Sequence, residues 1–349
     1  MFGRDARVVD IAACTGMGIP VYSSPYGHSH SAGTRRPSSF LFLMTCAASF
    51  LLAEFVISQI VLLSRKIGDR NLEMQAGNWQ KVSNDCHEVR GKTLGIVGYG
   101  HVGSQLGVLA EFMGMRVIWY DRLPLMPIGN SEPVDTLPGL LAQADYVTLA
   151  VTDAPDNTRL FKAEEFSQMK KGAIFIHTSY SEAVDLDALA DAIDSGHLAG
   201  AAVDSFPLSE RPTNGHVTKH RLASCPNVIL TPGISGKTLD AATRVGAEVA
   251  HCVARFIEEG CTQGALNFPV IETKPLRPNV RRILNVHKSV RGVVTEINNI
   301  LAEYNIERQT MVTKDGIGYV TIDVNIKEVT VDIVTSLALL ANSIRTRCL

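Results

Sequence analysis

The stretch that decides the fold covers residues 93–121 and reads TLGIVGYGHVGSQLGVLAEFMGMRVIWYD. It opens with a continuous apolar run at 93–97, which is typical of a strand buried on both faces of a parallel sheet. Three closely spaced glycines follow, then a helix expected over 104–113 and a second strand over 116–120. This order predicts the first unit of a doubly wound, parallel Rossmann sheet in an α/β protein.

The glycine turn has the spacing GxGxxG of a dinucleotide-binding motif, in the context that this motif requires. Its first glycine permits the tight turn, its second lets a pyrophosphate approach the backbone, and its third lets the helix pack closely on the strand. The phosphates would lie at the amino end of the helix. The residues of this candidate site are Gly98, Gly100, His101, Val102 and Gly103. A Rossmann-like fold without a ligand is the alternative.

An acidic residue stands where the motif requires one. Asp121 ends the second expected strand, where its carboxylate would accept hydrogen bonds from a ribose diol. The same charge would repel the 2′-phosphate of NADP. The sequence therefore predicts NAD as the cofactor.

Apolar strands and amphipathic helices alternate through the centre of the chain. Further strands are expected at 146–151, 173–177, 200–203 and 228–230, with helices between them such as 186–195. A short buried strand is expected near the amino end at 19–22, and a long helix at 237–259. The last part has the order strand, helix, strand, strand, helix, strand, which predicts helices packed on a small antiparallel sheet.

The amino-acid composition argues against several classes of function. The chain has 349 residues, 46% of them hydrophobic, which is enough for two or three globular domains. Its 33 basic and 35 acidic side chains leave a formal charge of −2, which argues against a nucleic-acid partner. Seven scattered cysteines without a CxxC pair suggest neither a metal site nor a disulfide framework. No cleavable signal opens the sequence, so we expect a cytoplasmic protein.

One segment is apolar enough to raise the question of a membrane. Residues 40–63 are almost wholly apolar and long enough to cross a bilayer. Glu54 and Gln59 interrupt the run, and a carboxylate near the centre of a membrane is costly. We therefore expect a buried helix that begins near Ser49, with a membrane span as the alternative.

Several motifs together carry a family resemblance. The stretch EVRGKTLGIVGYGHVGSQLGVLAEFMGMRVIWYD resembles the D-3-phosphoglycerate dehydrogenases, which belong to the D-isomer-specific 2-hydroxyacid dehydrogenases. The similarity continues through MKKGAIFIHTSYSEAVD, GHLAGAAVDSFP, PNVILTPGISGKT and LNFP. It implies NAD-dependent oxidation of 3-phosphoglycerate or a related 2-hydroxy acid, a place in serine biosynthesis, an oligomer, and a carboxy-terminal ACT domain that binds serine.

The resemblance also implies a domain order. It gives a truncated, partial flavodoxin-like substrate domain at 1–68, an NAD-binding Rossmann domain at 69–235, and a helix returning to the substrate domain at 236–266. A linker at 267–280 and an ACT domain at 281–349 follow. About 20 extra residues, near 32–49, interrupt the first of these, and their composition resembles a translated intron at 33–48.

The family's chemical positions are altered in this sequence. The arginine that clamps the substrate carboxylate is replaced by Tyr180, and a phenol supplies no bidentate cation. The histidine that transfers the proton is replaced by Gly233, which has no proton to give. The glutamate that orients this histidine aligns with Ser209.

Other residues could substitute for the missing acid. Glu210 lies one place after the altered glutamate, and Lys237 begins the helix that follows Gly233. Glu182 and His177 are further candidates near Tyr180. Proton transfer needs heavy atoms within hydrogen-bond reach, which a sequence does not establish.

The cofactor and effector positions are better preserved. The resemblance places Ser179, Asp204 and Gly236 at the cofactor, with Asp204 at the nicotinamide end. The family's Leu-His-Val-Pro wall of the cleft is changed to residues 149–152, LAVT. In the ACT part, the serine-binding positions correspond to His287, Ser289 and Asn305.

Two functions follow from this mixture. The first is an NAD-dependent oxidoreductase that acts on a 2-hydroxy or 2-oxo acid with a rebuilt site. The second is a catalytically inactive, NAD-binding paralogue, which pairs with an intact dehydrogenase as a regulatory or structural subunit.

Overall fold

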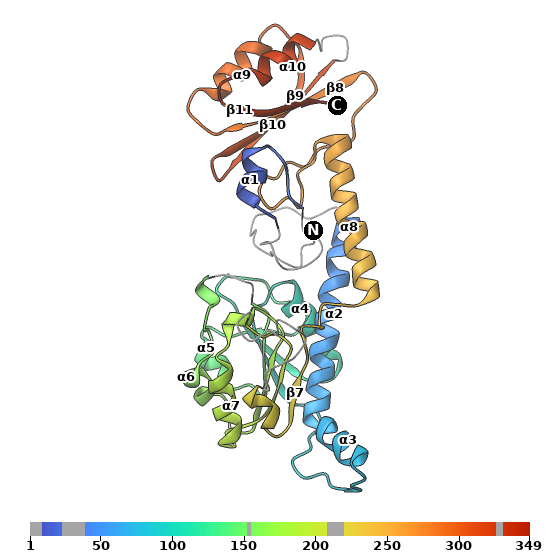
Figure 1. Cartoon of the computed structure of the whole chain (residues 1–349), viewed down its shortest axis with the longest axis vertical. Coiled ribbons are helices and arrows are strands. Elements are labelled where there is room, and N and C mark those ends of the chain that lie inside the picture. Colours follow the sequence, from blue (N-terminus) through green and yellow to red (C-terminus); the bar gives the residue numbers. More distant parts are fainter. Residues whose placement is uncertain (1–8, 23–38, 152–154, 208–219, 326–330) are drawn as a thin grey trace. The chain divides into compact units, whose positions relative to one another are not determined.

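The computed structural model describes residues 9–22, 39–151, 155–207, 220–325 and 331–349 (Figure 1). The chain divides into two compact units, each with its own sheet. The parallel-sheet unit is His28–Ala242, and the antiparallel-sheet unit combines Met1–Gly27 with Thr243–Leu349. The extra segment near 32–49 lies partly outside the described residues.

The parallel-sheet unit contains seven strands in the order β3-β2-β1-β4-β5-β6-β7. All of their pairings are parallel. The strands are β1 (Thr93–Val97), β2 (Arg116–Tyr120), β3 (Glu132–Pro133), β4 (Tyr146–Leu149), β5 (Ala173–His177), β6 (Leu198–Val203) and β7 (Val228–Leu230). The strand order reverses between β1 and β4, so the carboxyl ends of these strands border the crevice where such folds bind ligands. The predicted doubly wound sheet is confirmed.

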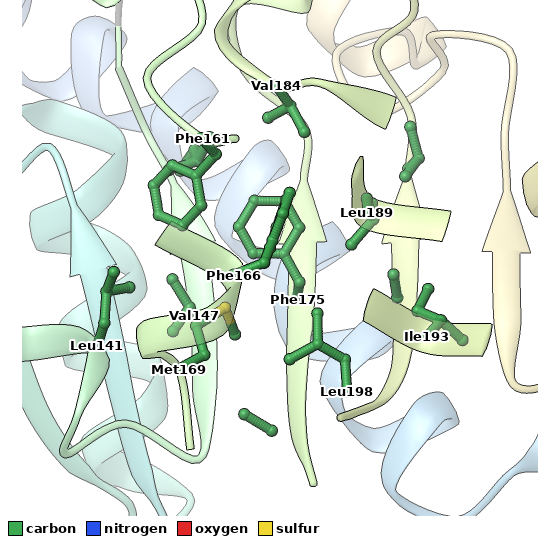
Figure 2. Close-up of a cluster of buried hydrophobic side chains, with 14 of the residues drawn as sticks. Leu141, Val147, Phe161, Phe166, Met169, Phe175, Val184, Leu189, Ile193 and Leu198 are labelled. Carbon is green, nitrogen blue, oxygen red and sulfur yellow. The ribbon is translucent and has the colours of Figure 1, made fainter. Parts of the chain in front are cut away.

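Helices cover both faces of this sheet. The helices of this unit are α2 (Ser39–Ser64), α3 (Ile67–Gln75), α4 (His101–Phe112), α5 (Leu137–Leu141), α6 (Ala163–Gln168) and α7 (Leu186–Asp194). Of these, α3 follows α2 and buries none of its residues. One buried cluster joins the sheet to α2 and α4. The other joins it to α5, α6 and α7 around Phe161, Phe166 and Phe175 (Figure 2). Each of these aromatic side chains contributes about 1.5–3 kcal/mol by leaving water.

Two helix starts differ from the prediction. The helix α4 begins at His101, three residues before the expected start, because Gly100 is its N-cap and offers no capping side chain to mark the boundary. The helix α2 begins at Ser39 and not near Ser49, because the apolar run can continue one helix across the expected boundary. Within the described part of the chain, no helix is long and apolar enough to cross a membrane.

The antiparallel-sheet unit has the predicted order of elements. Its sheet runs β11-β8-β10-β9, and α9 and α10 pack on one face around Ile283 and Ile322. The elements are α1 (Ile11–Gly16), β8 (Val280–Lys288), α9 (Val293–Leu301), β9 (Ile306–Lys314), β10 (Ile317–Asn325), α10 (Val331–Ala338) and β11 (Ser343–Cys348). The long helix α8 (Leu239–Glu259) lies mostly in this unit.

The prediction of a strand at 19–22 is wrong. Only a single antiparallel bridge forms there, between Tyr22 and Ala265. The segment is held instead by the Asn267 amide, whose oxygen accepts the Val21 N–H at 2.8 Å and whose nitrogen donates to the Ile19 carbonyl at 3.0 Å. The Asn267 side chain and the Leu266 N–H, which donates to the Val21 carbonyl at 2.9 Å, therefore take the place of a strand ladder.

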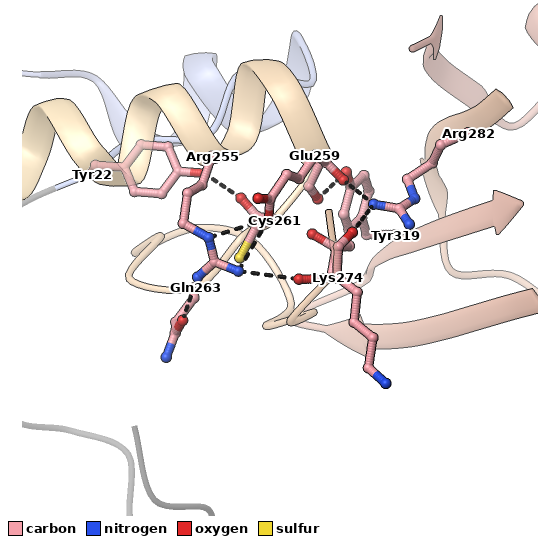
Figure 3. Close-up of polar contacts among 10 residues, drawn as sticks. Tyr22, Arg255, Glu259, Cys261, Gln263, Lys274, Arg282 and Tyr319 are labelled. Carbon is pink, nitrogen blue, oxygen red and sulfur yellow. Dashed lines mark hydrogen bonds and ion pairs between the residues drawn. The ribbon is translucent and has the colours of Figure 1, made fainter. Parts of the chain in front are cut away.

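A buried arginine ties the antiparallel sheet to the end of α8 (Figure 3). Arg282 forms two bonds to the Asp323 carboxylate, at 2.6 and 2.8 Å, and only 3% of its surface is exposed. Its remaining nitrogen donates to the carbonyls of Glu259 and Lys274. Glu259 is the last residue of α8, so the same guanidinium caps this helix and holds the segment that follows it.

We expect Arg282→Met to destabilise the antiparallel-sheet unit by about 3–5 kcal/mol, because the Asp323 carboxylate stays buried without its cation. Urea unfolding followed by circular dichroism measures this change. The double variant Arg282→Met/Asp323→Leu removes both charges and should regain most of the loss. Wild-type stability of Arg282→Met would contradict the assigned role.

Candidate nucleotide-binding site

Two glycines of the turn have no room for a side chain. Gly98 has a φ of 95°, and a Cβ on it would lie 2.8 Å from the Ala150 carbonyl oxygen. A Cβ on Gly103 would lie 2.2 Å from the carbonyl oxygen of Gly98. The turn therefore has the close packing of helix on strand that was predicted from the motif.

The amino end of α4 lies directly after this turn. Gly100 is its N-cap, has extended backbone, and offers no side chain to cap the first turn. The N–H groups there are the kind that bind phosphate oxygens, and the helix dipole favours a negative charge at this end. His101 is exposed and Val102 is partly buried, so the backbone of both residues borders the surface.

Asp121 lies beside the turn, as expected. Its Oδ2 accepts the Tyr99 N–H at 2.8 Å, and its Oδ1 accepts the Leu123 N–H at 3.0 Å. The residue is partly exposed. Each carboxylate oxygen has further acceptor capacity, so the pair of ribose hydroxyls can still donate to it.

Tyr99 is a residue of this site that the sequence reasoning missed. Its ring is 3% exposed and stacks on Trp119, with 4.2 Å between centroids and 12° between planes. Its hydroxyl lies 2.6 Å from the Ser131 hydroxyl and accepts the Ile128 N–H at 3.2 Å. The available signal was an aromatic side chain inside a glycine turn.

Asp204 organises the loop that carries Gly233. Its carboxylate accepts the Thr231 hydroxyl at 2.5 Å and the N–H groups of Ile234 and Ser235 at 2.9 and 3.0 Å. Gly233 has a φ of 71°, a conformation that favours glycine. Among the described residues, the Asp204 carboxylate thus bonds to this loop. The family resemblance predicted a contact between Asp204 and the nicotinamide instead.

The carboxyl end of β5 brings His177, Ser179 and Tyr180 together. His177 is fully buried. The Ser179 hydroxyl is buried and has no hydrogen-bond partner among the described residues, which suits a ligand contact. Tyr180 packs on the core of the sheet, and its hydroxyl lies 3.4 Å from that of Thr158. The side chain at position 180 is therefore a phenol and not a cation.

The remaining candidates are less informative. Gly236 and Lys237 are exposed on the loop before α8, and Glu182 is partly buried after Tyr180. Ser209, Glu210 and Thr152 lie outside the described residues. Among the residues that can be described, no group of three or more histidine, cysteine or acidic side chains could hold a metal ion.

The structure separates the candidate effector residues. His287 is buried at the end of β8 and pairs with Gly318, whereas Asn305 precedes β9, whose first residue pairs with Val324. Gly318 and Val324 are six residue steps apart along β10, a distance of about 20 Å. Ser289 is exposed near His287. One chain does not bring His287 and Asn305 together.

The chain is similar over most of its length to known dehydrogenases. Residues 57–235 match the family described as D-isomer specific 2-hydroxyacid dehydrogenase, NAD binding domain. The chain belongs to this dehydrogenase family. A D-3-phosphoglycerate dehydrogenase of Dictyostelium discoideum is 42% identical over 98% of this chain and 78% of its own length.

Further relatives agree with this family. The D-3-phosphoglycerate dehydrogenase of Escherichia coli K12 is 38% identical over 92% of this chain and 73% of its own length. Among solved structures, an NAD-dependent formate dehydrogenase from Staphylococcus aureus in complex with NAD is 25% identical. It has a TM-score of 0.57 over 72% of this chain and 69% of its own. NAD is thus the cofactor of the domain that this dehydrogenase chain carries.

The residues present fit that cofactor. The cradle formed by Gly98 and Gly103, the acceptor Asp121 and the unpartnered Ser179 hydroxyl all lie at carboxyl ends of neighbouring strands. This is the edge at which a doubly wound sheet binds a dinucleotide.

We expect Asp204→Asn to loosen the loop 231–235 by about 1–3 kcal/mol of local stability, because an amide cannot accept all three hydrogen bonds. Hydrogen exchange at the Ile234 and Ser235 amides measures the change. Asp194→Asn is the matched control, since that carboxylate binds Arg221 on a different surface. Equal exchange in Asp204→Asn and wild type would count against the assigned bonds.

Burial lowers the pKa of the His287 imidazole below its ordinary value. Its unfolded form, with a pKa of about 6.5, binds a proton more readily than the folded form. The contribution of His287 to the free energy of unfolding is therefore fully present above about pH 6.5. It falls as the pH drops below this value, by at most about 1.4 kcal/mol per pH unit. Unfolding measured between pH 7 and 5 tests this, and His287→Gln should reduce the slope. An unchanged slope would rule out His287 as its source.

Proposed function

We propose that this chain is a D-3-phosphoglycerate dehydrogenase-type protein of serine biosynthesis ancestry that binds NAD but transfers hydride slowly or not at all. Its substrate class is 3-phosphoglycerate or a related 2-hydroxy acid. It acts in the cytoplasm as the NAD-binding subunit of an oligomer with an intact dehydrogenase. The contrast between a complete nucleotide cradle and the residues at 180 and 233 carries this proposal.

The nucleotide half of the site supports binding. Gly98 and Gly103 shape the turn, the first N–H groups of α4 would bind the pyrophosphate, and Asp121 would accept the ribose hydroxyls. Ser179 would contact the cofactor farther along the sheet edge. When bound, NAD supplies a hydride acceptor or donor.

The chemical half lacks two groups that the reaction needs. As hydride leaves the carbon of a 2-hydroxy acid, the proton of its hydroxyl must pass to a base within hydrogen-bond reach. Gly233 has no side chain for this step, and among the described residues a Cβ there would meet the Asp204 carbonyl oxygen alone, at 3.7 Å. Tyr180 has no positive charge with which to bind the substrate carboxylate.

A working enzyme with a rebuilt acid is the second candidate. Lys237 supports it, because this exposed residue follows Gly233 on the same loop and its N–H donates to the Ile234 carbonyl. If Lys237 were the acid, Lys237→Met would abolish a measurable turnover of 2-oxo acids. Serine as an effector would require two copies of the chain for a site that uses both His287 and Asn305.

We expect the wild-type chain to bind NADH, whereas its turnover of 2-oxo acids stays near background. The double variant Tyr180→Arg/Gly233→His should raise turnover by about 10²–10⁴-fold, because it restores a cation and a proton donor. A histidine at position 233 must adopt the positive φ of Gly233, which costs about 1–2 kcal/mol. The rate of NADH oxidation measures the gain.

The control is Tyr180→Arg/Gly233→Ala, which carries the same backbone strain without a proton donor. It should stay near background. Fast turnover by the wild-type chain would contradict the proposal, and so would failure to bind NADH. Co-purification with an intact D-3-phosphoglycerate dehydrogenase tests the subunit role, and two separate species would contradict that part.

A further inference from the structure

Tyr99 contacts two different parts of the nucleotide site, one through its backbone and one through its side chain. We propose that Tyr99 is a positioning residue that fixes the adenosine end of the site by holding Asp121 and the loop at 122–131 in one arrangement. This inference rests on the proposed binding of NAD. It concerns a residue that the GxGxxG motif leaves unspecified.

The backbone contact fixes the ribose acceptor. The Tyr99 N–H donates to Asp121 Oδ2 at 2.8 Å, and the Leu123 N–H donates to the other oxygen at 3.0 Å. One donor on each oxygen restricts the rotation of the carboxylate. The acceptor positions for a ribose diol therefore depend on how the turn and the start of the loop are placed together.

The side-chain contact fixes the far end of the same loop. The phenol lies 2.6 Å from the Ser131 hydroxyl, 3.3 Å from the Ile128 carbonyl oxygen and 3.2 Å from the Ile128 nitrogen. Tyr99 and Ser131 are 3% and 5% exposed, so water does not replace these bonds easily. The stack on Trp119 of β2 fixes the ring itself.

Helix α4 holds the same loop independently. Glu111 Oε1 accepts the Asn130 N–H at 2.9 Å, and Gly129 turns with a φ of 71° beside that carboxylate. Among the described residues, the Glu111 side chain makes no hydrogen bond to the glycine turn or to Asp121. The phenol therefore links the far end of this loop, at Ile128 and Ser131, to the turn that would bind the cofactor.

Loss of the Tyr99 hydroxyl should weaken binding of the adenosine half of a ligand and leave binding of the other half unchanged. Removing the phenol oxygen leaves the ring, its stack and every glycine in place, but removes the bonds of Tyr99 to Ile128 and Ser131, so that Glu111 holds the loop end without them. The orientation of Asp121 then becomes less strictly held, because its second donor, Leu123, belongs to the same loop. Ligands that carry an adenosine ribose should lose affinity, and discrimination against a 2′-phosphate should weaken.

The test compares Tyr99→Phe with wild type in titrations of NADH, NADPH, ADP-ribose and nicotinamide mononucleotide. We expect the Kd values for NADH and ADP-ribose to rise by a common factor of about ten. The Kd for nicotinamide mononucleotide should not change, and the ratio of the NADPH Kd to the NADH Kd should fall. Hydrogen exchange at the Ile128 amide should become faster in the ligand-free chain.

The matched control is Tyr319→Phe, which removes an equally buried phenol from the other unit, where it donates to the Gly260 carbonyl at 2.7 Å. This variant should leave all four Kd values unchanged. If wild type binds NADH and Tyr99→Phe binds it equally well, the positioning role is overturned while the proposed function stands. An equal rise in the Kd for nicotinamide mononucleotide would overturn the positioning role as well. A wild-type chain that binds neither NADH nor ADP-ribose overturns both proposals.

Discussion

The parallel-sheet unit depends on one close approach, between Gly103 of α4 and the carbonyl oxygen of Gly98 at the end of β1. A Cβ at 103 would lie 2.2 Å from that oxygen, so any other residue would push the helix away from the strand. This contact places the amino end of α4 at the edge where the strand order reverses. The placement of the N–H groups that would bind phosphate, the Tyr99 bond to Asp121 and the packing of the next helical turn all depend on it.

The two halves of the site differ in how completely they are built. The nucleotide half has a glycine cradle, an acceptor held by two N–H donors, and a buried serine hydroxyl that suits a ligand. The chemical half has an ordered loop, because Asp204 binds Thr231 and Ser235, but this loop presents Gly233. The loop and the strand end are thus retained, while position 180 carries a phenol and position 233 carries no side chain.

The sequence predicted what depends on local pattern. The bounds of β2 and β5 agree with their apolar runs, and the order of the elements in both sheets was also expected. It could not predict contacts between distant residues. The segment at 19–22 is apolar like a strand, yet Asn267 holds it. Tyr99 depends on Ser131, whose position no local pattern reveals. The start of α4 was missed because its N-cap is a glycine.

The central claim is that the chain holds NAD without using it, and a single-turnover experiment tests it most directly. The chain is mixed with one equivalent of NADH, binding is followed by NADH fluorescence, and an excess of the 2-oxo acid that corresponds to 3-phosphoglycerate is then added. The account predicts enhanced fluorescence that persists after the addition, because bound NADH is not oxidised. Rapid loss of the NADH signal, or no change in fluorescence on mixing, would contradict it.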